Sequence, residues 1–231
     1  MCNRIKASFE FREVKVRWNL FNELSEFKPI YNIAPYRKEA DVLAIVRTQA
    51  GNEGRLMFWP LIPYYENTTR LSYSTMNARI EGLRKSRTYK NLLDRRRCII
   101  PVDGFYEFQG KRPPKTPWFL YLRSGEPFGL AGLWDTWKKP DGSLLNSFTI
   151  IVRDPNDFIR PIHDRMPVIL RREDEEKWLD CTNPFDKAEA ALQQFPSELM
   201  AAHVTSTRVN NPNYNLPDCG DPVEEQGPLL L

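Results

Sequence analysis

The stretch FGLAGLWDTWKKPDGSLLNSFTIIV, residues 128–152, decides the fold class because it has the pattern of two strands joined by a tight turn. Its two ends, Phe128–Trp134 and Phe148–Val152, are apolar and rich in β-branched and aromatic residues, which are typical of strands. Between them, Lys139-Pro140-Asp141-Gly142 has the composition of a hairpin turn. The stretch therefore predicts an antiparallel pair of strands.

Similar apolar runs recur on both sides of this pair, separated by Pro, Gly, Asp and Asn. We expect further strands at Val42–Val46, Leu56–Trp59, Cys98–Val102, Trp118–Leu122 and Val168–Leu170. Helical periodicity is found at Phe9–Leu24, Ile80–Leu93, Asp174–Leu179 and Asp186–Gln194. Many strands with few, scattered helices predict an α+β fold on curved antiparallel sheet rather than regular βαβ units. We expect one domain over residues 1–223 and a loose acidic and apolar tail over residues 224–231.

Length and composition are those of a globular protein with a sizeable core. The chain has 231 residues, of which 41% are hydrophobic, a size that suits one domain or at most two. It has no run of about 18 apolar residues that would span a membrane, and no apolar signal at the amino terminus. We therefore expect a cytoplasmic, nucleoid-associated protein without a membrane partner, and a monomer is the default.

Four cysteines are spread far apart, and none forms a CxxC pair. In a reducing compartment we expect free thiols, and with only His163 and His203 available a metal site is not expected. We find no glycine-rich phosphate loop, so no cofactor is expected either.

The net charge of +3 is too small to indicate a nucleic-acid partner, but its distribution is uneven. Residues 79–97 carry eight basic side chains: Arg79, Arg84, Lys85, Arg87, Lys90, Arg95, Arg96 and Arg97. A solvated helix face is the simplest interpretation of this segment, and phosphate binding is the alternative.

Cys2 is the first candidate for chemistry. Removal of Met1 is expected before so small a residue, and it would leave an α-amine and a thiol on adjacent carbons. Such an aminothiol condenses with an aldehyde to an imine, which the sulfur then closes to a five-membered thiazolidine. Because the reference pKa of an α-amine is about 7.7–8.0, roughly a tenth of it is uncharged at neutral pH. The alternative is a cysteine without function at a frayed terminus.

Three internal residues are further candidates, each with a structural alternative. His163 lies in a loop after a predicted strand, where it could transfer protons or belong to an ion-pair cluster. Glu107 lies among aromatic residues, where desolvation would raise its pKa, unless it lies on a solvent face. Asn77 could orient a substrate or cap a helix. His203 has apolar neighbours and is interpreted as structural.

Taken together, these motifs resemble the SOS-response-associated peptidase (SRAP) family of abasic site processing proteins. The resemblance runs over about residues 2–223, in the family's order. It rests on CNR at 2–4, YNIAP at 31–35, WPLIP at 59–63, NAR at 77–79, RRCIIP at 96–101, DGFYE at 103–107, LAGLW at 130–134, IHDRMP at 162–167 and VNNP at 209–212.

The resemblance implies a single domain of curved, barrel-like antiparallel sheet with peripheral helices, which clasps single-stranded DNA. It implies that Cys2 is the nucleophile that forms a thiazolidine with the ring-opened abasic sugar, and that Glu107 is the acid–base group. His163 would assist opening of the sugar and release of the adduct, and Asn77 would orient Cys2 or the sugar. The implied DNA contacts are Arg4, Arg79 and Arg165 on phosphates, with Pro35, Tyr65 and Phe108 against the strand.

The chain departs from the family pattern at a few positions. Asn3 and Pro60 stand where the family usually has Gly, and Tyr65 and Phe108 stand where Trp is common. Asn tolerates left-handed backbone better than most residues, so a tight turn at Asn3 can survive. Tyr64 and Tyr65 together could replace the aromatic wedge.

Two other classes of function remain open at this stage. One is a cysteine peptidase or self-processing hydrolase, which would act on another protein because only Met1 precedes Cys2. The other is a non-catalytic module that binds single-stranded DNA. We expect covalent crosslinking, with possible lyase and peptidase activity, over these alternatives.

Overall fold

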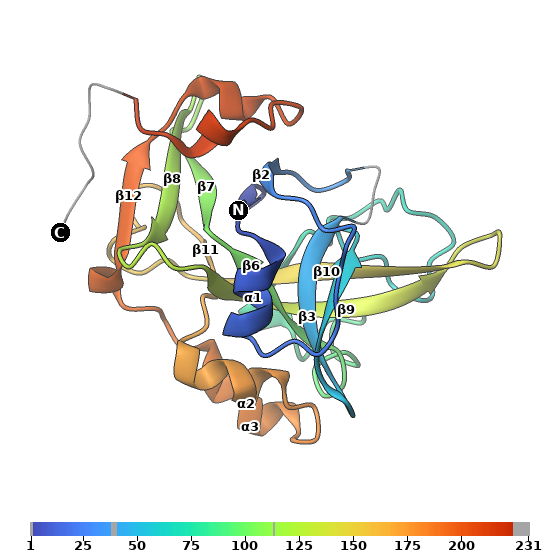
Figure 1. Cartoon of the computed structure of the whole chain (residues 1–231). Helices are drawn as coiled ribbons and strands as arrows, with labels where there is room; N and C mark the ends of the chain where they lie inside the picture. Colours follow the sequence, from blue (N-terminus) through green and yellow to red (C-terminus); the bar gives the residue numbers. More distant parts are fainter. Residues whose placement is uncertain (1, 38–40, 113, 224–231) are drawn as a thin grey trace.

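Two antiparallel sheets make up most of the structure, a computed structural model that describes residues 2–37, 41–112 and 114–223 (Figure 1). The five-stranded sheet has the order β12 (Met200–Val204), β8 (Thr116–Leu122), β7 (Gly104–Gln109), β1 (Ile5–Ala7) and β2 (Ile30–Ile33). The seven-stranded sheet has the order β11 (Met166–Pro167), β10 (Leu144–Arg153), β9 (Phe128–Lys138), β6 (Arg97–Val102), β3 (Val42–Thr48) and β4 (Gly51–Met57), and β5 (Asn77–Arg79) pairs with β10 in parallel.

The predicted α+β class is confirmed, and the sheets are mostly antiparallel with few helices. The sheets are not closed into a barrel, because each ends in an edge strand at both sides. Asp103 alone separates β6 from β7, so the chain passes directly from one sheet into the other. This junction brings the start of β7 close to β1, which bears the amino terminus.

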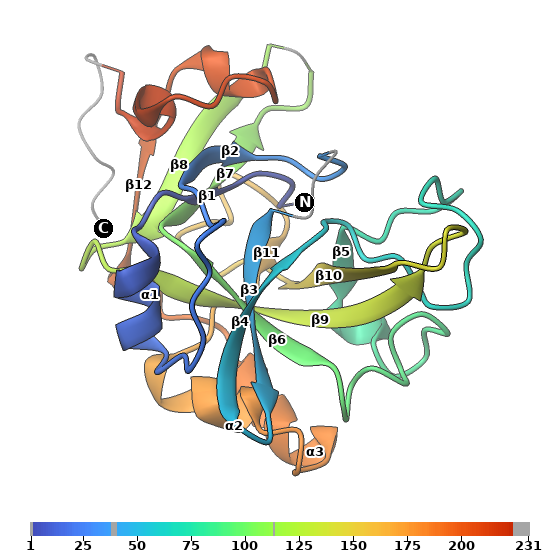
Figure 2. The same ribbon diagram turned by 45° about the vertical axis from the view of Figure 1, so that its right-hand side comes forward.

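The helices are peripheral, as expected, but shorter than predicted, and α2 and α3 lie together below the sheets in Figures 1 and 2. The α-helices are α1 (Phe11–Arg17), α2 (Glu175–Leu179) and α3 (Phe185–Ala188). The 3-10 helices are η1 (Ile80–Gly82), η2 (Arg172–Asp174), η3 (Glu189–Leu192), η4 (Ser197–Leu199), η5 (Thr207–Asn210) and η6 (Pro217–Gly220). None of the helices in the described part of the chain is long and apolar enough to cross a bilayer.

The predicted hairpin at residues 128–152 is confirmed. Strands β9 and β10 pair over most of their length and project from the body of the molecule (Figure 1). The turn closes where Lys139 N–H donates to the Ser143 carbonyl oxygen at 2.8 Å, and Gly142 adopts a φ of 84° that favours glycine. The turn chemistry at Pro140-Asp141-Gly142 therefore sets the register of the longest strand pair.

Several predicted elements were wrong in extent. The helix predicted at Ile80–Leu93 is only η1 followed by successive turns, because Gly82, Ser86 and Thr88 have low helix propensity. The helix predicted at Phe9–Leu24 is limited to α1. The strand predicted at Val168–Leu170 begins earlier as β11 and continues only as an isolated bridge at Ile169.

The basic segment at 79–97 is mostly exposed, as the simplest interpretation expected, but it is not a helix face, and Arg97 and Arg96 have structural contacts. Arg97 is fully buried and donates to the carbonyl oxygens of Leu93, Trp178, Asp180 and Asn183. Arg84 pairs with Asp186 and Glu189 near α3, and the Arg96 guanidinium lies 4.1 Å from the centre of the Trp134 ring. These residues bind the 80–97 segment to the second sheet and α2–α3. The predicted tail at 224–231 lies outside the described residues.

Candidate active site around Cys2

The amino-terminal segment is fixed along β7. Strand β1 pairs with β7 at Ile5 and Phe105, and Tyr106 N–H donates to the Arg4 carbonyl oxygen at 3.0 Å. A Cβ atom on Gly104 would overlap the Phe119 ring and the Leu120 carbonyl oxygen, so glycine there permits the close approach of β7 to β8. Because Cys2 lies only three residues before Ile5, the pairing of β1 with β7 also places Cys2 close to β7.

Cys2 is buried and held by its backbone. Its carbonyl oxygen accepts a hydrogen bond from Asn77 Nδ2 at 2.8 Å, and its Sγ lies 4.0 Å from the Arg4 carbonyl oxygen. Burial raises the pKa of the Cys2 thiol, and the negative charge of Glu107 raises it further. The thiol is therefore protonated at neutral pH.

The Asn77 side chain contacts Cys2 from the seven-stranded sheet. It lies in β5, paired with Ile150 of β10, so its interpretation as a helix cap was wrong. Trp59 Nε1 donates to the Met76 carbonyl oxygen at 2.9 Å, which fixes the residue before Asn77. The side-chain oxygen of Asn77 is buried and has no hydrogen-bond partner within the described part of the chain. Asn77 can therefore accept a further hydrogen bond in the site.

Glu107 is only 1% exposed, which excludes a position on the solvent face. Burial raises the pKa of its carboxyl group to about 7, so the group is near half ionised at neutral pH. Its Oε1 atom is buried and lacks a hydrogen-bond partner among residues 2–37, 41–112 and 114–223. A buried carboxyl group of this kind can both accept and donate a proton.

His163 lies beside Glu107, in the loop between β10 and β11. Its Nε2 is 3.7 Å from Glu107 Oε2, while its Nδ1 accepts Arg165 N–H at 3.1 Å and lies 2.9 Å from Asp164 Oδ1. Burial lowers the pKa of His163, so the neutral ring predominates at pH 7. Nδ1 faces both a donor, Arg165 N–H, and an acceptor, Asp164 Oδ1, so either nitrogen of the neutral ring can carry the proton.

His203 lies elsewhere, in β12 of the first sheet. Its Nε2 is 2.6 Å from the Gly220 carbonyl oxygen, and its ring packs against Phe119 and Tyr121. This setting agrees with its interpretation as a structural residue.

The three arginines expected to bind phosphate differ in their surroundings. Arg79 is exposed and makes no ion pair or hydrogen bond through its side chain to the described residues. Arg165 contacts Glu81 Oε1 at 2.5 Å and Asp154 Oδ1 at 3.1 Å. Arg4 donates to Asn32 Oδ1 at 3.3 Å and to the Asn210 carbonyl oxygen at 3.4 Å. Arg79 is therefore the cation that can bind an anion without breaking an existing contact.

Aromatic residues lie near the turns before β5. Tyr65 is partly covered, because its hydroxyl lies 3.1 Å from Thr88 Oγ1 and the Arg87 guanidinium lies 4.5 Å from its ring centre. The Tyr64 ring packs edge-on against the Tyr65 ring, with 5.4 Å between the ring centres, and Tyr64 is 62% exposed. Tyr64 thus offers more free ring surface than Tyr65.

Pro35 and Phe108 lie in two separate hollows. Pro35 is half-buried in a hollow shared with Tyr36 and Pro212. Phe108 lines a different groove, which is also lined by His163. The structure therefore brings Cys2, Asn77, Glu107 and His163 together and leaves the expected DNA contacts spread around them.

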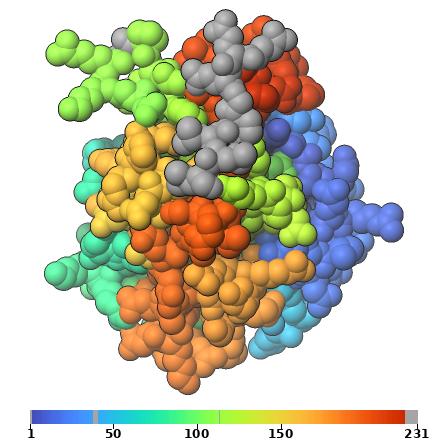
Figure 3. All heavy atoms as spheres, turned by 90° about the vertical axis from the view of Figure 1, so that its left-hand side faces the viewer, coloured from blue at the N-terminus to red at the C-terminus, as the bar shows by residue number. Residues whose placement is uncertain are grey.

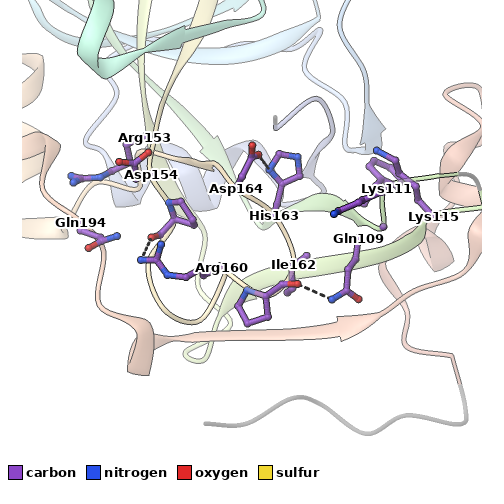
Figure 4. A pocket seen from close by; sticks show the side chains of 14 residues that line it. Gln109, Lys111, Lys115, Arg153, Asp154, Arg160, Ile162, His163, Asp164 and Gln194 are labelled. Atoms are coloured by element: carbon purple, nitrogen blue, oxygen red, sulfur yellow. Dashed lines mark hydrogen bonds and ion pairs between the residues drawn. The ribbon is translucent and has the colours of Figure 1, made fainter.

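A groove of about 1020 Å³ opens beside His163 (Figure 4). In Figure 3 the light-green β7–β8 turn projects above the yellow-orange residues 153–164, and these two segments form its walls. The basic residues that line it are Lys111, Lys115, Arg153 and Arg160. Sequence reasoning named Phe108 and His163 but missed the groove, because Lys111, Lys115, Arg153 and Arg160 lie outside the motifs and are brought together only by the fold. The density of lysines and prolines at 111–117 is the one signal that could have drawn attention to it.

The fold and this cluster define a class of protein: an α+β scaffold that buries a cysteine next to the amino terminus against a glutamate and a histidine. The model of the family described as "SOS response associated peptidase (SRAP)" matches residues 1–212. The chain belongs to this family.

Relatives support the assignment over nearly the whole chain. "Abasic site processing protein YoqW" of Bacillus subtilis (strain 168) is 36% identical over 222 residues, which cover 94% of this chain and 98% of the relative. "Abasic site processing protein HMCES" of Xenopus tropicalis is 30% identical over 236 residues, covering 89% of this chain and 70% of the relative. A crystal structure of a Bacteroides thetaiotaomicron protein has a TM-score of 0.83 at 24% identity, covering 96% of this chain and all of that chain, and shows the same fold.

Proposed function

We propose that this protein processes abasic sites in single-stranded DNA by forming a covalent thiazolidine through Cys2, once Met1 is removed. The observation that carries the proposal is the cluster in which Asn77 binds the Cys2 carbonyl oxygen at 2.8 Å while Glu107 and His163 lie beside it. The names of the relatives, which process abasic sites, support the choice of substrate.

The chemistry needs no group beyond this chain and the sugar. The uncharged Cys2 amine attacks C1′ of the ring-opened abasic deoxyribose and forms a carbinolamine. Loss of the hydroxyl group as water, with a proton from Glu107, gives the protonated imine, which keeps its N–H. The Cys2 sulfur then adds to the imine carbon while its proton passes to the Glu107 carboxylate, and the five-membered ring closes. The overall reaction joins aldehyde and aminothiol and releases one water.

The protonation states favour this order of steps. Because the thiol pKa is raised, sulfur is a poor nucleophile before the imine forms, and the amine reacts first. Glu107, with a pKa of about 7, can give a proton to the leaving hydroxyl group and later take one from sulfur. Neutral His163, whose Nε2 faces Glu107, is placed to assist opening of the sugar ring or, in reverse, release of the adduct.

The surroundings of Cys2 suit a strand without sequence preference. Arg79 offers an uncommitted guanidinium for a phosphate, and exposed Tyr64, adjacent to Tyr65, offers a ring on which a base can stack. On the other side, Lys111 and Lys115 line the groove that begins at Phe108 and His163. We propose that the strand runs between these two sides across Cys2. We expect Arg4 and Arg165 to contribute less to binding of the strand, because the side chains of both already contact other residues of the protein.

Replacing Arg79 with alanine is expected to lower the salt dependence of single-stranded DNA binding by about 0.7 in the log–log slope, the value for one lost phosphate contact on a single strand. Arg165→Ala should change the slope less, because Arg165 is already paired with Glu81 and Asp154. Fluorescence anisotropy with an undamaged oligonucleotide at several salt concentrations measures both slopes. Equal slopes for Arg79→Ala and wild type would remove Arg79 from the phosphate contacts.

The function itself is tested by incubating the pure protein with a single-stranded oligonucleotide that carries one abasic site. A band that survives denaturation, and that Cys2→Ala lacks, supports crosslinking. Salt-sensitive binding without a covalent band would instead indicate a binding module, and cleavage of a peptide substrate would indicate a peptidase. Either of these results, without a covalent band, contradicts the proposal.

A further inference from the structure

Gln109 connects β7 with the loop that bears His163. It lies two residues beyond Glu107, so the two side chains leave the strand on the same face. Its Nε2 donates to the Pro161 carbonyl oxygen at 2.8 Å, two residues before His163 (Figure 4). Its Oε1 accepts from Trp118 Nε1 at 3.0 Å, and Trp118 is the cross-strand partner of Glu107 on β8.

Only one orientation of the Gln109 amide satisfies both neighbours. The indole N–H of Trp118 can only donate, and the carbonyl oxygen of Pro161 can only accept. Oε1 must therefore face Trp118, and Nε2 must face Pro161. The indole of Trp118 thus sets the direction of the amide, and the amide sets the position of the loop.

The loop itself, residues 156–165, is internally ordered. Asn156 Oδ1 accepts Ile159 N–H at 3.0 Å, and His163 N–H donates to the Ile159 carbonyl oxygen at 3.0 Å. Since these bonds hold the turn together, a displacement of Pro161 displaces His163 with it. Arg165, at the other end, contacts Glu81 and Asp154 rather than β7.

We propose that Gln109 is a positioning residue, which holds the 156–165 loop against β7 and so sets the separation between His163 and Glu107. The inference rests on the function proposed above. The 3.7 Å between His163 Nε2 and Glu107 Oε2 is slightly beyond hydrogen-bond distance. A small movement of the loop toward β7 would bring the two atoms within hydrogen-bond distance, and a small movement away would separate them further. The position of the loop therefore controls whether His163 and Glu107 can share a proton.

Gln109→Ala is expected to slow formation of the crosslink about tenfold, the cost of one well-placed hydrogen bond to a catalytic geometry. Trp118→Phe, which keeps an aromatic side chain but removes the indole N–H donor, should cause a smaller loss. Gln193→Ala is the matched control, because Gln193 is an exposed glutamine that does not line this groove and makes no hydrogen bond to the described residues of the His163 loop. Its rate should equal that of the wild type. Single-turnover kinetics with an abasic oligonucleotide measure all three.

A double-mutant cycle separates positioning from general stabilisation. In a His163→Ala background, Gln109→Ala should cause no further loss, because Gln109 acts through His163. A full tenfold loss in that background, or a wild-type rate for Gln109→Ala alone, overturns the proposal.

An NMR titration tests the same inference without DNA. Detaching the loop exposes the His163 ring, so Gln109→Ala should raise the His163 pKa toward its ordinary value, while Gln193→Ala leaves it unchanged. An unchanged His163 titration in Gln109→Ala overturns the positioning role. This readout is independent of crosslinking: if the wild type forms no adduct, the proposed function fails while the placement of His163 by Gln109 is still decided.

Discussion

A chain with one glycine inserted between Met1 and Cys2 is expected to form no stable adduct with an abasic oligonucleotide. The insertion keeps the Cys2 thiol but gives the α-amine to the new glycine, so nitrogen and sulfur no longer lie on adjacent carbons. The terminal glycine amine can still condense with the aldehyde, but that imine has no sulfur to close the ring and it hydrolyses. Gel analysis under denaturing conditions measures the yield, with a loss to background expected.

Borohydride reduction is the control for this variant. A trapped band that appears only with borohydride shows that the inserted chain still binds the lesion and forms the imine. Asn3→Gly is a matched variant that changes the same segment without moving the amine, and its adduct should persist. An unaffected yield from the inserted chain would refute the thiazolidine.

Replacing Glu107 with glutamine is expected to slow crosslink formation about a hundredfold, the lower end of the range for a general acid–base group. Glutamine keeps the shape and polarity of the side chain but cannot exchange a proton. Because the pKa of Glu107 is raised to about 7 by burial, the wild-type rate should show an inflection near pH 7 that the variant lacks, while the rise due to the Cys2 amine, with a reference pKa of about 7.7–8.0, persists in both. Rates measured between pH 5.5 and 8.5 test both points, and a variant with the wild-type rate and profile would remove Glu107 from the mechanism.

The same raised pKa makes the stability of the folded wild type depend on pH, whereas Glu107→Gln lacks this dependence. A carboxyl group whose pKa is raised on folding stabilises the fold fully below its unfolded value of 4.5, and that stability is lost as the pH rises through about 7. The wild type therefore loses stability between pH 5 and pH 8 through this group, and Glu107→Gln does not. Thermal denaturation at these two pH values should show a smaller drop in Tm for the variant. Equal drops would mean that burial of Glu107 does not perturb its ionisation.

Much of the fold followed from local patterns. The hairpin at residues 128–152 was predicted because Pro140-Asp141-Gly142 and the apolar runs on either side act locally. Strands β1, β2, β5, β7 and β12 were not predicted. Of these, β1, β2, β5 and β12 are three to five residues long and owe their pairing to neighbours far along the chain, as when Ala78 pairs with Ile151.

Parts of the candidate site followed from sequence and parts did not. The aromatic neighbours of Glu107 left burial and a solvent face open as alternatives, and the fold buries the side chain. The roles of Asn77 and His163 were not decidable from their own segments, because the hydrogen bond from Asn77 joins residues 75 positions apart. The resemblance to a family supplied what local chemistry could not. Gln109 carried no motif, since its importance depends on Pro161, which the fold brings to it.

The most direct test of the central claim is the intact mass of the protein–oligonucleotide adduct, measured with and without borohydride. We predict the mass of a chain that begins at Cys2, plus the abasic oligonucleotide, minus one water, unchanged by borohydride because a thiazolidine has no imine to reduce. An adduct that retains Met1, or one that gains hydrogen on reduction, would contradict an aminothiol mechanism at Cys2.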